Sequence, residues 1–279
     1  MSKYFPVHTL GSRAVFTEGF SDVAVFTKMV KDFTGVSLKI KKVENDKAFL
    51  KPVGNVKVEF DLFAEDEENR IVVEAQHANY TQNFERFYYY HQVATVEIIK
   101  SSRDYCFPKT VYTLVFFTDR HSPVLGKNIL VHDAEMKYLV DGKVVERVFP
   151  CKHRLFFIFV KDPEGDTRIP EECQEWIKAI HETLRESVCL DDFEKIEILT
   201  LFKRIEKDKL PPETRAKMML EYNQQDAIEA AVDEKVFELA ENIIRLNSEV
   251  PDSYVADVTK LPVQKIQALR KNLKRNGEN

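Results

Sequence analysis

The segment from Val56 to Gln76, VKVEFDLFAEDEENRIVVEAQ, places the strongest constraint on how this chain can fold. Two runs of alternating apolar residues flank an acidic, turn-like centre from Glu65 to Asn69, the pattern of a β-hairpin. A hairpin symmetric about its midpoint places Asp61 opposite Glu74, with their Cβ atoms about 5 Å apart. Like charges so paired repel, and a purely structural sheet usually avoids them. The pairing therefore favours a chemical role.

Asp61, Glu74 and Gln76 are predicted to share the polar face of this hairpin, together with Lys57 and Glu59. The two carboxylates supply the hard oxygen ligands that magnesium requires. The Gln76 amide could orient a water molecule or contact a phosphate oxygen. Such a site could hold a metal ion that assists phosphodiester cleavage. The alternative is a solvent-exposed acidic hairpin face without chemistry.

Hydrophobic periodicity assigns most of the remaining elements. Residues 1–20 have no clear pattern, and Gly11 and Gly19 are interpreted as breaks. The predicted elements up to residue 161 are a helix capped by Ser21 or Asp22 and ending at Gly35, strands at 37–42 and 47–52, a helix from Thr81 to Ile99, strands at 111–118 and 155–161, and a turn at Asp141-Gly142 between them.

A composition shift at Pro163–Asp166 predicts two regions, an α/β core over residues 1–165 and a helical region over 166–279. Helices are predicted at 170–187, 191–207 and 212–246, followed by two short helices. These two, at about 250–275, resemble a helix-turn-helix, although the glycine common at its turn is absent. Lys265, Arg270, Lys271, Lys274 and Arg275 in the last helix could follow a phosphate backbone. A plain helical cap on the domain is the alternative.

The composition indicates a folded intracellular protein. Of the residues, 44% are hydrophobic, and the four cysteines lack metal-ligand spacing, so a reducing, cytoplasmic location is predicted. No signal peptide is expected, and no apolar run is long enough to predict a membrane span. The net charge of −5 does not favour nucleic-acid binding, so any such role must rest on local basic clusters. Lys39, Lys41 and Lys42 form one such cluster, for which a solvated surface is the plainer interpretation.

The hairpin and its flanking segments resemble the PD-(D/E)XK nuclease superfamily, specifically the Rpn family of recombination-promoting nucleases and putative transposases. The matching stretches are KVEFDLFAEDEENRIVVEAQ, the aromatic helix NFERFYYYHQVATVEI with Arg86, the strand VYTLVFF, and the helical C-terminal end. The resemblance implies a restriction-endonuclease-like mixed β-sheet flanked by helices. It also implies a magnesium-dependent DNA endonuclease, with Mn²⁺ as a possible substitute, linked to recombination or transposition.

By this resemblance Asp61 and Glu74 are the metal-binding carboxylates, and Gln76 replaces the lysine of the superfamily. The family's upstream acid, in an Asp-x-x-Phe-Lys pattern, has no counterpart, because Ser12 or Arg13 stands at that place. Glu18 and Asp22 are candidate substitutes. The alternative function is a weak or inactive nuclease fold that binds DNA or protein, and a homodimer is plausible for cutting both strands.

Three further residues are candidates near the hairpin. His77 could be a base, or could pack on the next helix. His91 is expected to pack or to form a hydrogen bond among the tyrosines of its helix. Arg86 could contact phosphate, or pair with Glu85 or Glu59.

Overall fold

The computed structural model describes residues 4–49, 56–77, 84–99, 105–118, 129–145, 151–160 and 168–276. It divides into two compact units, Met1–Met218 and Met219–Asn279. Over the described residues it contains a six-stranded mixed sheet, a two-stranded sheet and eight α-helices. The predicted α/β class is therefore confirmed.

The six-stranded sheet is built around the predicted hairpin. Its central strands β4, β5 and β7 are parallel, and antiparallel strands extend it at both edges. In spatial order the strands are β2 (Glu44–Ala48), β3 (Glu59–Glu65), β4 (Asn69–Gln76), β5 (Thr110–Phe117), β7 (Arg154–Phe159) and β6 (Ile129–Asp133). The smaller sheet pairs β1 (Tyr4–Pro6) with β8 (Ser187–Cys189).

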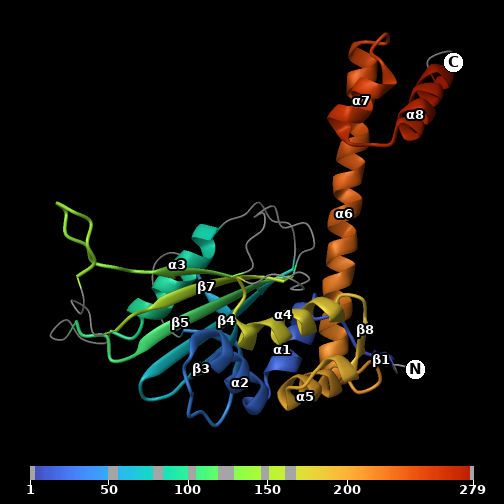
Figure 1. The fold of residues 1–279 in the computed structure, drawn as a ribbon. Coiled ribbons are helices and arrows are strands. Elements are labelled where there is room, and N and C mark those ends of the chain that lie inside the picture. Colours follow the sequence, from blue (N-terminus) through green and yellow to red (C-terminus); the bar gives the residue numbers. More distant parts are fainter. Residues whose placement is uncertain are drawn as a thin grey trace. The chain divides into compact units, whose positions relative to one another are not determined.

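Helices cover both faces of the large sheet (Figure 1). On one face lie α1 (Arg13–Phe20) and α2 (Val23–Thr34), where the Phe16 ring is 5.6 Å from that of Phe116. On the other lies α3 (Phe84–Val96), whose Phe87 packs against Val115 and Leu155. Consecutive residues of β3 and β4 are consequently buried. At the open end of the hairpin, the residues predicted for its polar face border one pocket; they are Lys57, Glu59, Asp61, Glu74 and Gln76.

The helix α2 begins and ends as predicted, because Asp22 accepts hydrogen bonds from the Ala24 and Val25 amides and Gly35 adopts a left-handed φ of 78°. The preceding helix α1 was not predicted, since Gly19 was interpreted as a break. A Cβ atom at Gly19 would lie 2.6 Å from Leu201 Cδ1. This glycine therefore permits close helix packing rather than ending a helix.

Two features near the hairpin differ from prediction. Residues 37–42 form no strand, and the edge strand β2 lies at Glu44–Ala48, overlapping only the start of the predicted strand at 47–52. Alternation in a short polar segment carries little information, so its pairing with β3 decides its position. The predicted start of a helix at Thr81 and the segment 163–166 lie outside the described residues.

Several helices of the region predicted at 166–279 belong to the first unit. They are α4 (Glu171–Thr183), the short 3₁₀ helix η1 (Leu190–Asp192), α5 (Ile196–Arg204) and the start of α6 (Pro212–Leu246). Trp176 of α4 is fully buried, and its Nε1–H donates to Asp32 of α2 at 2.8 Å. The boundary between units thus falls at residues 218 and 219 rather than at 165 and 166, because α4 and α5 bury their apolar faces against α1 and α2.

The second unit has a small helical core. The end of α6 packs with α7 (Asp252–Thr259) and α8 (Val263–Asn276). Its buried residues are Ala240, Ile244, Val255 and Ile266. Among the described residues, no helix has the length and apolarity needed to cross a membrane.

Candidate functional site

The hairpin brings Asp61 and Glu74 together in the predicted register. Its ladder pairs Phe63 with Val72 and Leu62 with Val73, so the next positions are Asp61 and Glu74. There the carboxylates bond to the main chain. The Asp61 N–H donates to Glu74 Oε1 at 3.2 Å, and the Ala75 N–H donates to Asp61 Oδ2 at 2.8 Å. The two carboxylates are thereby held at the end of the hairpin.

Both carboxylates line a pocket of about 360 Å³ at the carboxyl end of β4. The pocket receives side chains from both sides of the sheet, Arg13 from α1 and Arg86 and Tyr90 from α3. Its lining residues are Arg13, Lys57, Glu59, Asp61, Glu74, Ala75, Gln76, Arg86 and Tyr90. Of the residues predicted for the site, Asp61, Glu74, Gln76 and Arg86 thus meet in one pocket.

Arg13 is the functional candidate that sequence reasoning did not select. Its guanidinium forms an ion pair with Asp61 and lies 2.9 Å from Asp46 and 3.6 Å from Glu59. The available signal was its position, since the stretch containing Ser12 and Arg13 stands where the resembled family carries an acid. A cation therefore occupies a place at which a third carboxylate was sought.

Burial controls the charge of the carboxylate pair. Asp61 and Glu74 are only 4% and 3% exposed. Burial and the adjacent Asp61 charge raise the pKa of Glu74 well above its ordinary value of 4.5. Burial also raises the pKa of Asp61, although Arg13 and the Ala75 N–H oppose this shift. Without a further cation the pair tends to retain a proton, as expected for a site that gains from binding positive charge.

This shift predicts a pH-dependent stability. Because the folded-state pKa of Glu74 is raised, its contribution to the free energy of unfolding is fully present below about pH 4.5 and is lost as pH rises through the folded pKa. In EDTA, Glu74→Gln should therefore flatten the decline in stability above pH 4.5. Urea unfolding from pH 4 to 8 measures this decline. An identical slope of the free energy of unfolding against pH in the wild type and Glu74→Gln would contradict the raised pKa of Glu74.

Arg86 and Gln76 complete the pocket in different ways. The Arg86 guanidinium lies over the Phe87 and Tyr90 rings, at 5.5 and 5.1 Å from their centroids, and its charge lowers the pKa of Glu74. The Gln76 carbonyl accepts a hydrogen bond from the Thr118 N–H at 3.0 Å, which fixes the end of β4 beside β5. Both residues are held by aromatic or main-chain contacts next to the carboxylates.

Glu18 and Asp22, the predicted substitutes for the missing acid, do not line the pocket. Glu18 forms an ion pair with Arg204 of α5 at 2.7 Å. Asp22 is the N-cap of α2. Both carboxylates have structural partners because they lie beyond the first turn of α1, whereas Arg13 at its start is the α1 residue that lines the pocket.

His77 packs inside the fold. Its ring lies 6.3 Å from that of Phe16, and Nδ1 shares a hydrogen bond with Thr118 Oγ1 at 2.7 Å. The packing partner is α1, not the following helix as predicted. Burial and the nearby Arg13 charge lower the pKa of His77 to about 3. The imidazole is therefore neutral near pH 7, with little basicity.

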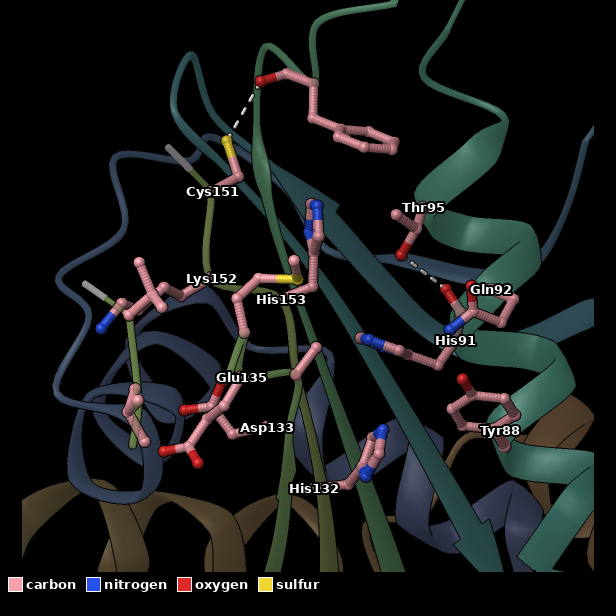
Figure 2. Close-up of a pocket in the computed structure, with 15 residues that line it drawn as sticks. Tyr88, His91, Gln92, Thr95, His132, Asp133, Glu135, Cys151, Lys152 and His153 are labelled. Atoms are coloured by element: carbon pink, nitrogen blue, oxygen red, sulfur yellow. Dashed lines mark hydrogen bonds between the residues drawn. The ribbon is translucent and has the colours of Figure 1, made fainter. Parts of the chain in front are cut away.

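His91 lies in a second pocket, of about 450 Å³, between α3 and the segment that follows β6 (Figure 2). As predicted, it forms a hydrogen bond, between Nδ1 and Thr113 Oγ1 at 2.9 Å. Burial and the charges of His153 and His132 lower its pKa to about 4. Within the described ranges, neither pocket assembles three or more His, Cys, Asp or Glu side chains around a point that could hold a metal ion.

Comparison with known protein families, curated proteins and solved structures finds no match to this chain.

Proposed function

We propose that this protein is a magnesium-dependent endonuclease that hydrolyses DNA phosphodiester bonds at the Asp61–Glu74 pocket. The observation that carries the proposal is the burial of two adjacent carboxylates, one with a strongly raised pKa, at the carboxyl end of a central strand. The cost of burying two like charges is offset by a bound cation. The resemblance to the Rpn nucleases supplies the reaction class.

The donor set fits magnesium. Mg²⁺ is usually bound by one or two carboxylates, with water and substrate phosphate oxygens completing its shell. Asp61 and Glu74 supply two carboxylates at an open pocket, which leaves room for the phosphate. When bound, the ion would neutralise charge on the phosphate and lower the pKa of a water molecule.

The remaining pocket residues would bind and orient the substrate. Arg86 and Lys57 are cations on the pocket wall, suited to phosphate oxygens. The Gln76 amide, two residues beyond Glu74, would orient the attacking water through a hydrogen bond. Tyr90 supports Arg86 by the contact between ring and guanidinium. A homodimer would present two such pockets to the two strands.

The position of Arg13 favours a second candidate function, a nuclease-like fold that binds DNA or protein without cutting. Arg13 already neutralises Asp61, as a metal ion would. With Lys57 and Arg86 it also balances the formal charge of Glu59, Asp61 and Glu74. The endonuclease requires Mg²⁺ to displace Arg13 from Asp61, whereas the binding function leaves this ion pair intact.

A plasmid-nicking assay separates the two candidates. For the endonuclease, the wild-type protein should nick supercoiled plasmid with Mg²⁺ or Mn²⁺ and not with EDTA. Arg13→Gln should lower the Mg²⁺ concentration for half-maximal nicking by about tenfold, because the competing cation is removed. If neither protein nicks the plasmid but both still bind it, the endonuclease proposal fails and the binding function is supported.

A further inference from the structure

The second unit has the construction of a helix-turn-helix. Two helices, α7 and α8, are joined by the three residues Lys260, Leu261 and Pro262, and both pack on the end of α6. Val255 of α7 and Ile266 of α8 are fully buried in the shared core. This arrangement gives a compact three-helix unit with the outer side of α8 exposed.

Lys260 takes the place of the missing turn glycine. Its φ of 60° and ψ of 11° are left-handed, the conformation that usually selects glycine at a helix end. The turn is therefore formed although the sequence lacks its usual signal. Thr259 supports it, since its side chain accepts a hydrogen bond from the Leu261 N–H at 3.4 Å.

Arg270 of α8 connects the helices of the unit. Its guanidinium donates to Asp252 at 2.8 Å and to the Ser248 and Val250 carbonyls at 2.6 Å each. The side chain thus ties α8 to the start of α7, which fixes the angle at which α8 is presented. That Arg270 follows a phosphate backbone stays a prediction, and these contacts give the side chain a structural role within the unit.

The exposed side of α8 carries polar and basic residues at helical spacing. Gln264, Ala268 and Lys271 recur at positions i, i+4 and i+7, with Lys265 and Gln267 beside them, and all five are exposed. Charge is strongly segregated here. Residues 258–277 include no Asp or Glu, and their basic residues are Lys260, Lys265, Arg270, Lys271, Lys274 and Arg275. An anionic partner is therefore favoured over a neutral or basic helix-packing surface.

We infer that α8 is a recognition helix that enters the major groove of duplex DNA, an inference that rests on the proposed function for its choice of DNA. In a helix-turn-helix the second helix lies in the groove with its N-terminal residues at base edges. Gln264 and Gln267 suit contacts to adenine, and Ala268 suits close approach to a thymine methyl group. Lys271 suits phosphate or guanine contacts, whereas Lys265 Nζ lies over the Phe237 ring of α6, 5.4 Å from its centroid.

The test is fluorescence anisotropy of the full chain with a labelled 30-bp mixed-sequence duplex in EDTA, where cleavage does not interfere. Lys271→Ala should weaken binding by about fivefold to tenfold and reduce the slope of log affinity against log salt by about 1. The matched control is Lys235→Ala, which alters an exposed lysine on α6 in the same unit. It should leave both quantities unchanged.

A second variant tests base reading. The wild-type protein should select preferred sequences from a randomised duplex pool. Gln264→Ala should prefer these sequences over unselected duplexes about tenfold less strongly than the wild type does. Equal affinity for Lys271→Ala and wild type, or equal losses in Lys271→Ala and Lys235→Ala, would overturn the inference. So would α8 variants that change the oligomeric state but not DNA affinity, because exposed Tyr254 and Val258 on α7 could then mark an interface between copies.

These outcomes are distinguishable from failure of the endonuclease proposal. Binding in EDTA does not require Asp61 or Glu74, so an inactive protein that binds DNA through α8 retains this inference. Conversely, Lys271→Ala could leave both magnesium-dependent nicking and duplex affinity unchanged. That result would support the endonuclease proposal and contradict the inference that α8 is a recognition helix.

Discussion

Asp61→Asn is expected to reduce magnesium-dependent nicking of plasmid DNA by at least about 100-fold. A metal ion contributes several kcal/mol of charge stabilisation in the transition state, and each 1.36 kcal/mol is a factor of ten in rate. The amide keeps the size of the carboxylate but lacks the anionic oxygen. It also removes the ion pair with Arg13, so the pocket becomes more positive and repels a cation.

The matched control for this experiment is Glu67→Gln, an exposed residue in the turn of the same hairpin. It changes the same charge without touching the pocket, so its nicking rate should equal that of the wild type. Circular dichroism of both variants would show that the sheet is retained. Nicking by Asp61→Asn at the wild-type rate would remove Asp61 from the active site.

Trp176→Ala should destabilise the first unit by about 3–5 kcal/mol, the range for truncating a buried aromatic residue. The Trp176 side chain is fully buried, and its ring centroid lies 6.0 Å from that of Phe20. Its loss leaves a cavity between α4 and α1, and deprives the buried Asp32 of a hydrogen-bond donor. Urea denaturation would show a lower midpoint with little change in the m-value.

Two comparison variants sharpen this measurement. Trp176→Phe retains most of the ring volume but loses the hydrogen bond to Asp32, so a smaller cost of about 2 kcal/mol is expected. Ile196→Ala, at a position 71% exposed on α5, should change stability by less than about 0.5 kcal/mol. Trp176→Ala could instead shift a separate unfolding transition and leave the urea midpoint of the sheet unchanged. In that case α4 would not unfold with the first unit.

The hairpin, its register and the long helices could be predicted because their signals are local. The alternation from Val58 to Ala75 fixes the pairing of Asp61 with Glu74, and the periodicity predicts α6 at Pro212–Leu246. The fold class followed from dense apolar runs such as β5 and β7. These elements carry their own pattern without help from distant residues.

The features that sequence did not predict depend on tertiary contacts. Gly19 fits inside a helix because Leu201, far along the chain, packs on it closely. The pairing of Arg13 with Asp61 joins two segments separated by 48 positions, and no local pattern marks it. The structural role of Arg270 is likewise set by the Ser248 and Val250 carbonyls. In each case the role of one residue is defined by its neighbours in the folded protein.

The central claim, that Asp61 and Glu74 form a divalent-cation site, is tested most directly by isothermal titration calorimetry with Mg²⁺ and Mn²⁺ near pH 7. The wild-type protein should bind the ion at this pocket and, at pH values below the folded-state pKa of Glu74, release protons as it does so, because burial and the Asp61 charge raise that pKa. The binding heat and the proton release should both disappear in Glu74→Gln. Binding of equal strength in Glu74→Gln, or no binding by the wild-type protein, would contradict the claim.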